Sequence, residues 1–161
     1  MSFRGTHSGF RVLRPPPSRL RWLVLAATLL VLAQAAIGMA VNLYVMIPPR
    51  HPGAHPGDYL SGSFQSVNWA IVHGAAALAI HASLGIVVAA IAIGVASHAF
   101  RFGDRVIAGW STIAAALVIG AGFNGASFLD FNHNTSSLIM SLLALGAVAC
   151  YSIVLWLLGP A

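Results

Sequence analysis

The sequence contains no lysine and no glutamate, and its acidic residues are three aspartates. Only 7% of its 161 residues are charged, whereas a soluble domain carries about 25% charged residues. Such a chain has too few charged groups to cover a folded surface in water, so a soluble globular protein is excluded. Cysteine is also scarce: Cys150 is the only one, and no intrachain disulfide can form.

The scarcity of acidic residues also argues against several enzyme classes. Asp58, Asp104 and Asp130 are all expected in loops, so no acid pair is predicted inside a membrane span for hydrolysis or a proton relay. The string GAGFNG at 120–125 has the spacing of a dinucleotide fingerprint, but no strand precedes it. Its small residues favour close contact between helices, as in Ala121 and Gly125.

Apolar residues are abundant and make up 58% of the chain. They form four runs long enough to cross the roughly 30 Å hydrocarbon layer, and they lack the alternation of barrel strands. We therefore predict an all-α integral membrane protein, an up-down four-helix bundle. The approximate helices are 22–47, 67–97, 106–128 and 135–158 in a membrane domain 19–161.

The first of these runs also resembles a cleavable signal peptide, because the small-residue triplet Ala33-Gln34-Ala35 follows several arginines. However, the apolar run continues without a break to Ile47, which favours a retained helix. The residues before the domain, 1–18, are predicted to form a flexible cytoplasmic tail.

The arginines determine the predicted topology. Five precede the first apolar run and two lie in the 98–105 loop, whereas the 48–66 loop holds only Arg50. The positive-inside rule then places both termini in the cytoplasm and the loops 48–66 and 129–134 outside. This distribution accounts for the net charge of +5 without a nucleic-acid partner. The alanine-rich, lysine-free composition is compatible with a multi-pass protein of a bacterial plasma (inner) membrane.

The most informative residues are polar ones inside the predicted spans. Gln34 and Asn42 lie eight residues apart on the first span, and His73 and His81 lie eight apart on the second. Eight residues correspond to about 12 Å along a helix. Since the two spans are antiparallel, we expect Gln34 and His81 near mid-membrane, and Asn42 and His73 together in the outer half.

Two further residues are expected at the outer level: Asn124 near the end of the third span and His133 before the fourth. A histidine in a membrane span is by default a functional candidate. We therefore predict b-type haem ligation by His73 with His133 as its partner, and His81 as a third candidate ligand. The residues predicted to hydrogen-bond and orient these ligands are Asn42, Asn124 and Gln34.

Other interpretations of these histidines stay open. Either His73 or His81 could be a single axial ligand, bind another metal or handle protons. Either could instead form a structural bond between helices, for example His81 with Gln34 or His73 with Asn42. In the outer loop, His51 and His55 could contribute to a zinc or copper site, but they have no cysteine or defined acidic partner, so we expect them to be solvated.

Two stretches resemble a known family. The string LLVLAQAAIGMAVNLYV, followed by a helix with HASLG, resembles one four-helix half of a haem A synthase over about residues 22–158. That resemblance implies haem-binding histidines on the second and fourth helices, at His73 or His81 and approximately at His133. The family's glutamate, His-Arg motif and outer-loop cysteine pair are absent, so haem A synthesis is not implied. The strings FNGASFL and NLYVMIP also resemble small bacterial four-span membrane proteins.

Two functional hypotheses follow from the sequence. The first is a small polytopic membrane protein that binds b-type haem for electron transfer or haem handling, with a membrane redox partner. The second is a non-catalytic accessory or assembly subunit of a larger membrane complex, supported by the many small residues and the lack of a catalytic set. An oligomer is possible under either hypothesis. Transport by such an oligomer is the weakest alternative, because broken helices and intramembrane acids are not predicted.

Overall fold

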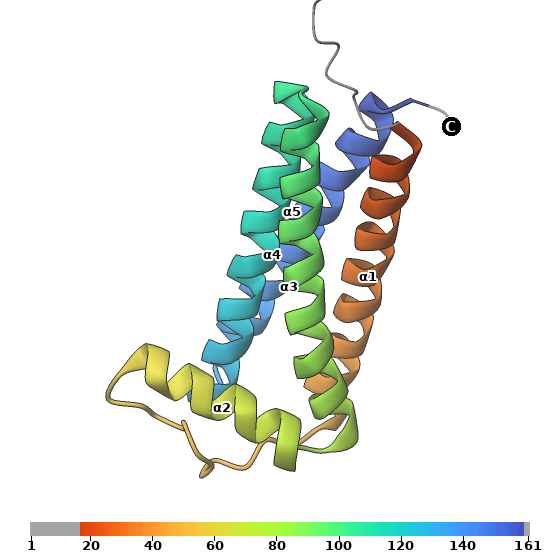
Figure 1. The fold of residues 1–161 in the computed structure, drawn as a ribbon. Coiled ribbons are helices and arrows are strands. Elements are labelled where there is room, and N and C mark those ends of the chain that lie inside the picture. Colours follow the sequence, from red (N-terminus) through yellow and green to blue (C-terminus); the bar gives the residue numbers. More distant parts are fainter. Residues whose placement is uncertain (1–16, 160–161) are drawn as a thin grey trace, which may run out of the picture.

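The computed structural model describes residues 17–159. Residues 1–16 of the predicted tail lie outside this range. The described residues form five α-helices and no strand. In chain order they are α1 (Pro17–Tyr44), α2 (Tyr59–His73), α3 (Ala76–Phe102), α4 (Arg105–Phe131) and α5 (Asn134–Leu157) (Figure 1).

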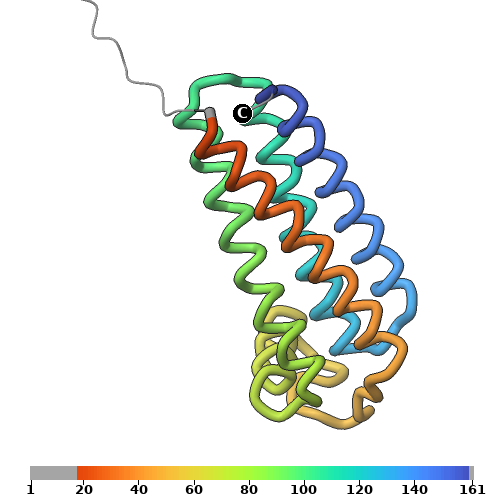
Figure 2. The backbone as a smooth tube through the Cα atoms, turned by 90° about the vertical axis from the view of Figure 1, so that its right-hand side faces the viewer, coloured from red at the N-terminus to blue at the C-terminus, as the bar shows by residue number. Residues whose placement is uncertain are grey.

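Four of these helices, α1, α3, α4 and α5, are long and apolar enough to cross a membrane. They form an antiparallel bundle in which α1 packs on α3, α3 on α4, α4 on α5, and α5 back on α1 (Figure 2). The predicted all-α membrane bundle is confirmed. Both described ends of the chain and the turn between α3 and α4 lie at one end of the bundle (Figure 1). The arginine count predicts that this end is cytoplasmic, and we call the opposite end the outer end.

The turn between α3 and α4 shows how local sequence sets the helix boundaries. Gly103 ends α3 with φ +85°, a left-handed conformation that suits a residue without a Cβ. Asp104 then begins α4, because its carboxylate accepts hydrogen bonds from the N–H groups of Val106 and Ile107 at 2.8 and 3.1 Å. The two helices are thereby joined by a short turn and must run antiparallel.

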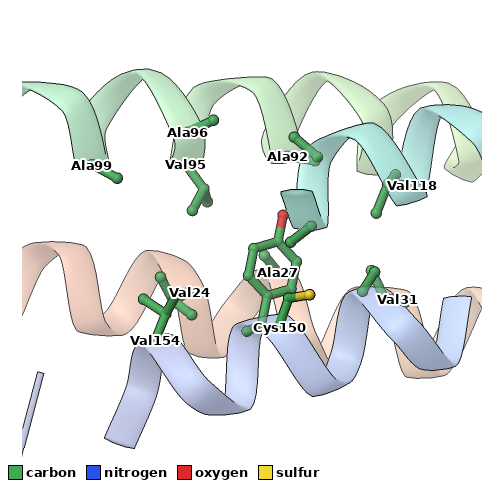
Figure 3. Close-up of a cluster of buried hydrophobic side chains, with 14 of the residues drawn as sticks. Val24, Ala27, Val31, Ala92, Val95, Ala96, Ala99, Val118, Cys150 and Val154 are labelled. Atoms are coloured by element: carbon green, nitrogen blue, oxygen red, sulfur yellow. The ribbon is translucent and has the colours of Figure 1, made fainter. Parts of the chain in front are cut away.

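The main core lies in the half of the bundle nearest the chain ends. Alanine and valine side chains from α1, α3, α4 and α5 interdigitate there (Figure 3). The ring of Tyr151 is fully buried among them, and Cys150 beside it is 6% exposed. Because alanine and valine are small, the helices approach closely, which is how helices associate where water does not drive packing.

The predicted second span, 67–97, is wrong in its boundaries. The chain leaves the helical conformation at Gly74 and Ala75, with ψ of 162° and 147°, so α2 ends at His73 and α3 begins at Ala76. A Cβ at position 74 would collide with the carbonyl oxygen of Ala70, so the close turn requires glycine. The membrane-crossing helix of this region is α3, and α2 lies across the outer end of the bundle (Figure 1).

The outer loop is correspondingly shorter than predicted. Asp58 accepts a hydrogen bond from the N–H of Ser61 at 2.8 Å and begins α2 as its N-cap. Residues 45–58 are therefore the loop, and the expected loop residues from 59 onwards are helical.

Candidate functional sites at mid-bundle and at the outer end

Gln34 and His81 meet between α1 and α3, as their predicted match in depth requires. The contact differs from the side-chain bond expected: Gln34 Nε2 donates to the main-chain carbonyl of His81 at 2.9 Å. Glycines on the facing helices make room for both side chains. A Cβ at Gly38 would lie 2.7 Å from His81 Cε1, and one at Gly85 would lie 3.1 Å from Gln34 Nε2. Each polar side chain therefore packs against the backbone of the opposite helix.

This pair leaves two buried polar atoms without a hydrogen-bond partner, His81 Nδ1 and Gln34 Oε1. A buried polar group without a partner typically destabilises a protein by about 1–3 kcal/mol. The His81 ring is itself half-buried rather than enclosed. At this position between α1 and α3, an imidazole nitrogen and an amide oxygen are therefore available to hydrogen-bond or bind a group from outside the chain.

The residues of the predicted outer polar layer lie on different elements. His73 is the exposed last residue of α2, and Asn42 is exposed on α1. Asn124 uses its side chain within its own helix, donating from Nδ2 to the carbonyl of Gly120 at 3.0 Å. His133 is exposed at the start of α5, and its ring centroid lies 6.3 Å from that of Phe131. No hydrogen bond joins any two members of this layer in the described structure.

The outer end holds a buried carboxylate at a position predicted to lie in a loop. Asp130, expected in a loop, lies in the last turn of α4 and is 1% exposed. Its Oδ2 accepts a hydrogen bond from Ser63 Oγ of α2 at 2.9 Å, whereas Oδ1 has no partner. Its main-chain carbonyl accepts from the N–H of His55 at 2.9 Å. Asp130 lies four residues after buried Ala126 and so continues the same buried helix face.

The outer loop is held against the bundle by His51. Its ring stacks on Trp69 of α2 at a centroid distance of 4.4 Å and an interplanar angle of 15°. Its Nε2 lies 3.1 Å from the carbonyl oxygen of Leu129, and its Nδ1 lies 3.0 Å from that of Pro52. The expectation that His51 is solvated is therefore wrong, since the ring links the loop, α2 and the end of α4. His55 is exposed.

Two small cavities lie at the outer end of the described structure. One of about 240 Å³ lies between the loop and α2, and one of about 160 Å³ lies between the loop and the end of α4. Pockets for drug-sized ligands typically measure about 300–1,000 Å³. Neither cavity is lined by His73 or His81. In the described part of the chain no group of three or more His, Cys, Asp or Glu residues is placed to hold a metal ion.

Two of the three glycines of the fingerprint string, Gly120 and Gly125, act as the packing interpretation predicts, whereas a Cβ at Gly122 would meet nothing within 4 Å. A Cβ at Gly120 or Gly125 would lie 3.4 Å from side chains of α5, namely Leu143 and Met140. These positions sit where α4 and α5 pack together, so the string is part of a helix contact.

Comparisons with known proteins identify no relative. No protein-family model matches the chain, and neither the curated proteins nor the solved structures contain a significant match to it. Its likeness to half of a haem A synthase remains a resemblance of short strings.

Proposed function

We propose that this protein is a non-catalytic subunit of a larger membrane complex, which it joins through the outward face of α3. One observation carries the proposal. Seven exposed residues recur along α3 in alternating steps of four and three, which is the heptad spacing of packed helices. They form what we call the α3 seam: Ala76, Ile80, Ser83, Val87, Ala90, Gly94 and Ser97.

The composition of the seam favours a partner helix over lipid alone. Every seventh residue is alanine or serine, so a neighbouring backbone can come close along the whole length of α3. Close backbone approach is what drives helix association in a bilayer, where burial of apolar side chains gains little. Beside the seam, Ile86, Ile93 and Phe100 form an exposed ridge with the same spacing of seven. Such a ridge and groove fit a second helix at a crossing angle of about 20°.

The open space beside Gly94 supports the same conclusion. A Cβ built at Gly94 meets nothing within 4 Å, whereas one at Gly38, Gly85 or Gly146 meets side chains of a neighbouring helix. Glycine in a helix interior is about 1 kcal/mol less favourable than alanine. The fold of this chain gives no packing reason for glycine at position 94, and a partner helix would supply one. Gly109 and Gly122 on α4 are exposed and open in the same way.

The proposal is tested by filling the seam. Gly94→Ile adds a branched side chain at its centre, and Ala149→Ile makes a comparable addition on the exposed face of α5. Each tagged variant is extracted from its native membrane in mild detergent, and its protein mass is measured by light scattering. We expect the wild type and Ala149→Ile to exceed the mass of one chain, and Gly94→Ile to fall to it. Differently tagged copies are co-expressed in parallel.

Three results would contradict the proposal. The wild type could have the mass of one chain, or Gly94→Ile could retain the mass of the wild type. Co-isolation of differently tagged copies without a second protein would show a homo-oligomer instead of a subunit of a mixed complex.

A second candidate function, b-type haem binding for electron transfer or haem handling, is supported by His81. Its Nδ1 is buried without a partner, and its half-buried ring lies at mid-bundle. The predicted pair His73 and His133 lies at the outer end on different elements, and both side chains are exposed. His81 would then be the one ligand that this chain provides to haem iron, whose redox chemistry the cofactor supplies.

The absorption spectrum tests this candidate. The protein is expressed with haem supply, purified and examined for a Soret band. We expect the band to disappear in His81→Ala and to persist in His73→Ala. A wild type without a Soret band, or a band that His81→Ala leaves unchanged, would rule out this role.

A further inference from the structure

The surface of α2 is divided into three stripes of different chemistry. The face packed on the bundle and the loop consists of small residues: Gly62, Ser63, Ser66 and Ala70. A second stripe, at steps of four, three and four, is apolar: Leu60, Phe64, Val67 and Ile71. A third, on the other side of the exposed surface, is polar over Ser61, Gln65 and Asn68 and ends at Val72, which is 62% exposed. No Asp, Glu, Lys or Arg occurs between residues 59 and 73.

The large apolar side chains of α2 are the ones left uncovered. Phe64 is 77% exposed and Leu60 is 56% exposed, whereas glycine, alanine and serine occupy the buried face. In an ordinary surface helix of a soluble protein the large apolar residues face the core. In α2 they face outward, so a second apolar environment must lie beside the helix.

The N-terminal end of α2 lies level with the outer turns of α4. The Tyr59 hydroxyl donates to the carbonyl of Phe123 at 3.1 Å and is 2.8 Å from Ser127 Oγ. Phe123 is eight residues before the end of α4, or about 12 Å along the helix axis. In Figure 1 this end of α2 is raised along the bundle, beside α4.

The length of α4 locates the edge of the hydrocarbon layer. Its 27 residues span about 40 Å, about 10 Å more than the hydrocarbon thickness. If the excess is shared equally, the outer edge of the hydrocarbon falls about three residues before the end of α4, near Phe128. Tyr59 is bonded to α4 at or inside that edge, so α2 begins at the depth where acyl chains meet headgroups.

We infer that α2 is an interfacial helix of the outer leaflet. Its apolar stripe inserts between lipid acyl chains, and its polar stripe faces the headgroups and water. The apolar stripe continues the lipid-facing surface of the bundle, because Phe123, beside Tyr59, is itself 50% exposed. A neutral helix with an apolar and a polar side fits the boundary between acyl chains and headgroups. The bilayer thereby fixes the outer end, including the buried Asp130 that α2 covers.

Paired spin labels on adjacent residues test this orientation. Cys150→Ala removes the single native thiol, and Phe64→Cys and Gln65→Cys then place nitroxides on the apolar and polar stripes. Both positions are exposed, so labelling leaves the packed face intact. A second pair, Leu60→Cys and Ser61→Cys, repeats the measurement one turn earlier. The proteins are reconstituted in phosphatidylethanolamine–phosphatidylglycerol vesicles.

Collision of the labels with oxygen, which partitions into lipid, is compared with collision with a water-soluble nickel chelate. We expect the ratio of oxygen to nickel collisions to be several-fold higher at position 64 than at 65, and higher at 60 than at 61. Equal ratios with strong nickel collision at both stripes would show that α2 lies in water. Labels at 60 and 64 that neither reagent reaches would show that a protein, such as a second copy, covers the stripe. Either result overturns the inference.

Discussion

Replacing Gly38 with alanine should destabilise the bundle at mid-membrane, where the His81 ring of α3 packs against α1. The added Cβ would lie 2.7 Å from His81 Cε1 and 3.2 Å from Nε2, against about 3.5–4.0 Å for an unstrained contact. The histidine ring must move by most of an ångström. The backbone of His81 is not free to follow, because its carbonyl accepts a hydrogen bond from Gln34. Over-packing of this kind costs typically about 1–3 kcal/mol.

Gly94→Ala is the matched control in the isolated chain. Both substitutions replace glycine with alanine inside a membrane helix, so the change in helix propensity largely cancels. At Gly94 the new methyl group meets nothing within 4 Å. The difference between the two variants should therefore be the over-packing term, about 1–3 kcal/mol in free energy of unfolding. At about 2–4 °C per kcal/mol this corresponds to a difference in Tm of roughly 2–12 °C.

The chain provides its own reporter for this assay. Cys150 is the single cysteine and is 6% exposed, so a thiol-reactive fluorogenic dye labels it when the bundle opens on heating. We expect Gly38→Ala to be labelled at a lower temperature than the wild type, and Gly94→Ala at the same or a higher one. Equal midpoints for the two variants would refute the close packing of His81 on α1.

Three further substitutions test the outer end. Ser63→Ala removes the hydrogen bond to Asp130 Oδ2 and leaves that buried carboxylate without a side-chain donor, so we expect a loss of about 1–3 kcal/mol in the same melting assay. Tyr59→Phe removes the hydroxyl that holds α2 to α4. We expect faster amide hydrogen exchange over the first turns of α2 and a loss of about 1 kcal/mol in free energy of unfolding. Unchanged exchange would show that the bond is unimportant. Gly53→Ala places a methyl group at φ +92° against the side chain of Ser66, so we expect it to lower the Tm. The control Gly57→Ala adds a methyl group in open space and should leave the Tm unchanged.

The membrane bundle could be predicted because apolar length is a strong signal. The spans other than the second were placed to within a few residues, and antiparallel order was enough to set Gln34 and His81 at one depth. The break at Gly74 could not be predicted in the same way. The apolar pattern runs through it, and the turn depends on a close approach to the carbonyl of Ala70 that only the folded chain reveals.

The candidate sites were less predictable than the spans because they depend on which side of each helix faces inward. All faces of α3 are apolar, and sequence periodicity alone does not distinguish the inner from the outer face of such a helix. His81 was identified as a candidate residue, whereas the α3 seam became evident only from its exposure. Asp130 was assigned to a loop because a carboxylate ends an apolar run, and its donor, Ser63, is distant in sequence.

The central claim, that a second protein covers the α3 seam, is tested most directly by site-specific photocrosslinking in intact membranes of the native host. A diazirine amino acid is introduced at Gly94 and, as the control, at Ala149 on the exposed face of α5. We predict a discrete adduct at position 94 with a second, different membrane protein, and no protein adduct at position 149. Crosslinking of position 94 to lipid alone, as at position 149, would contradict the claim.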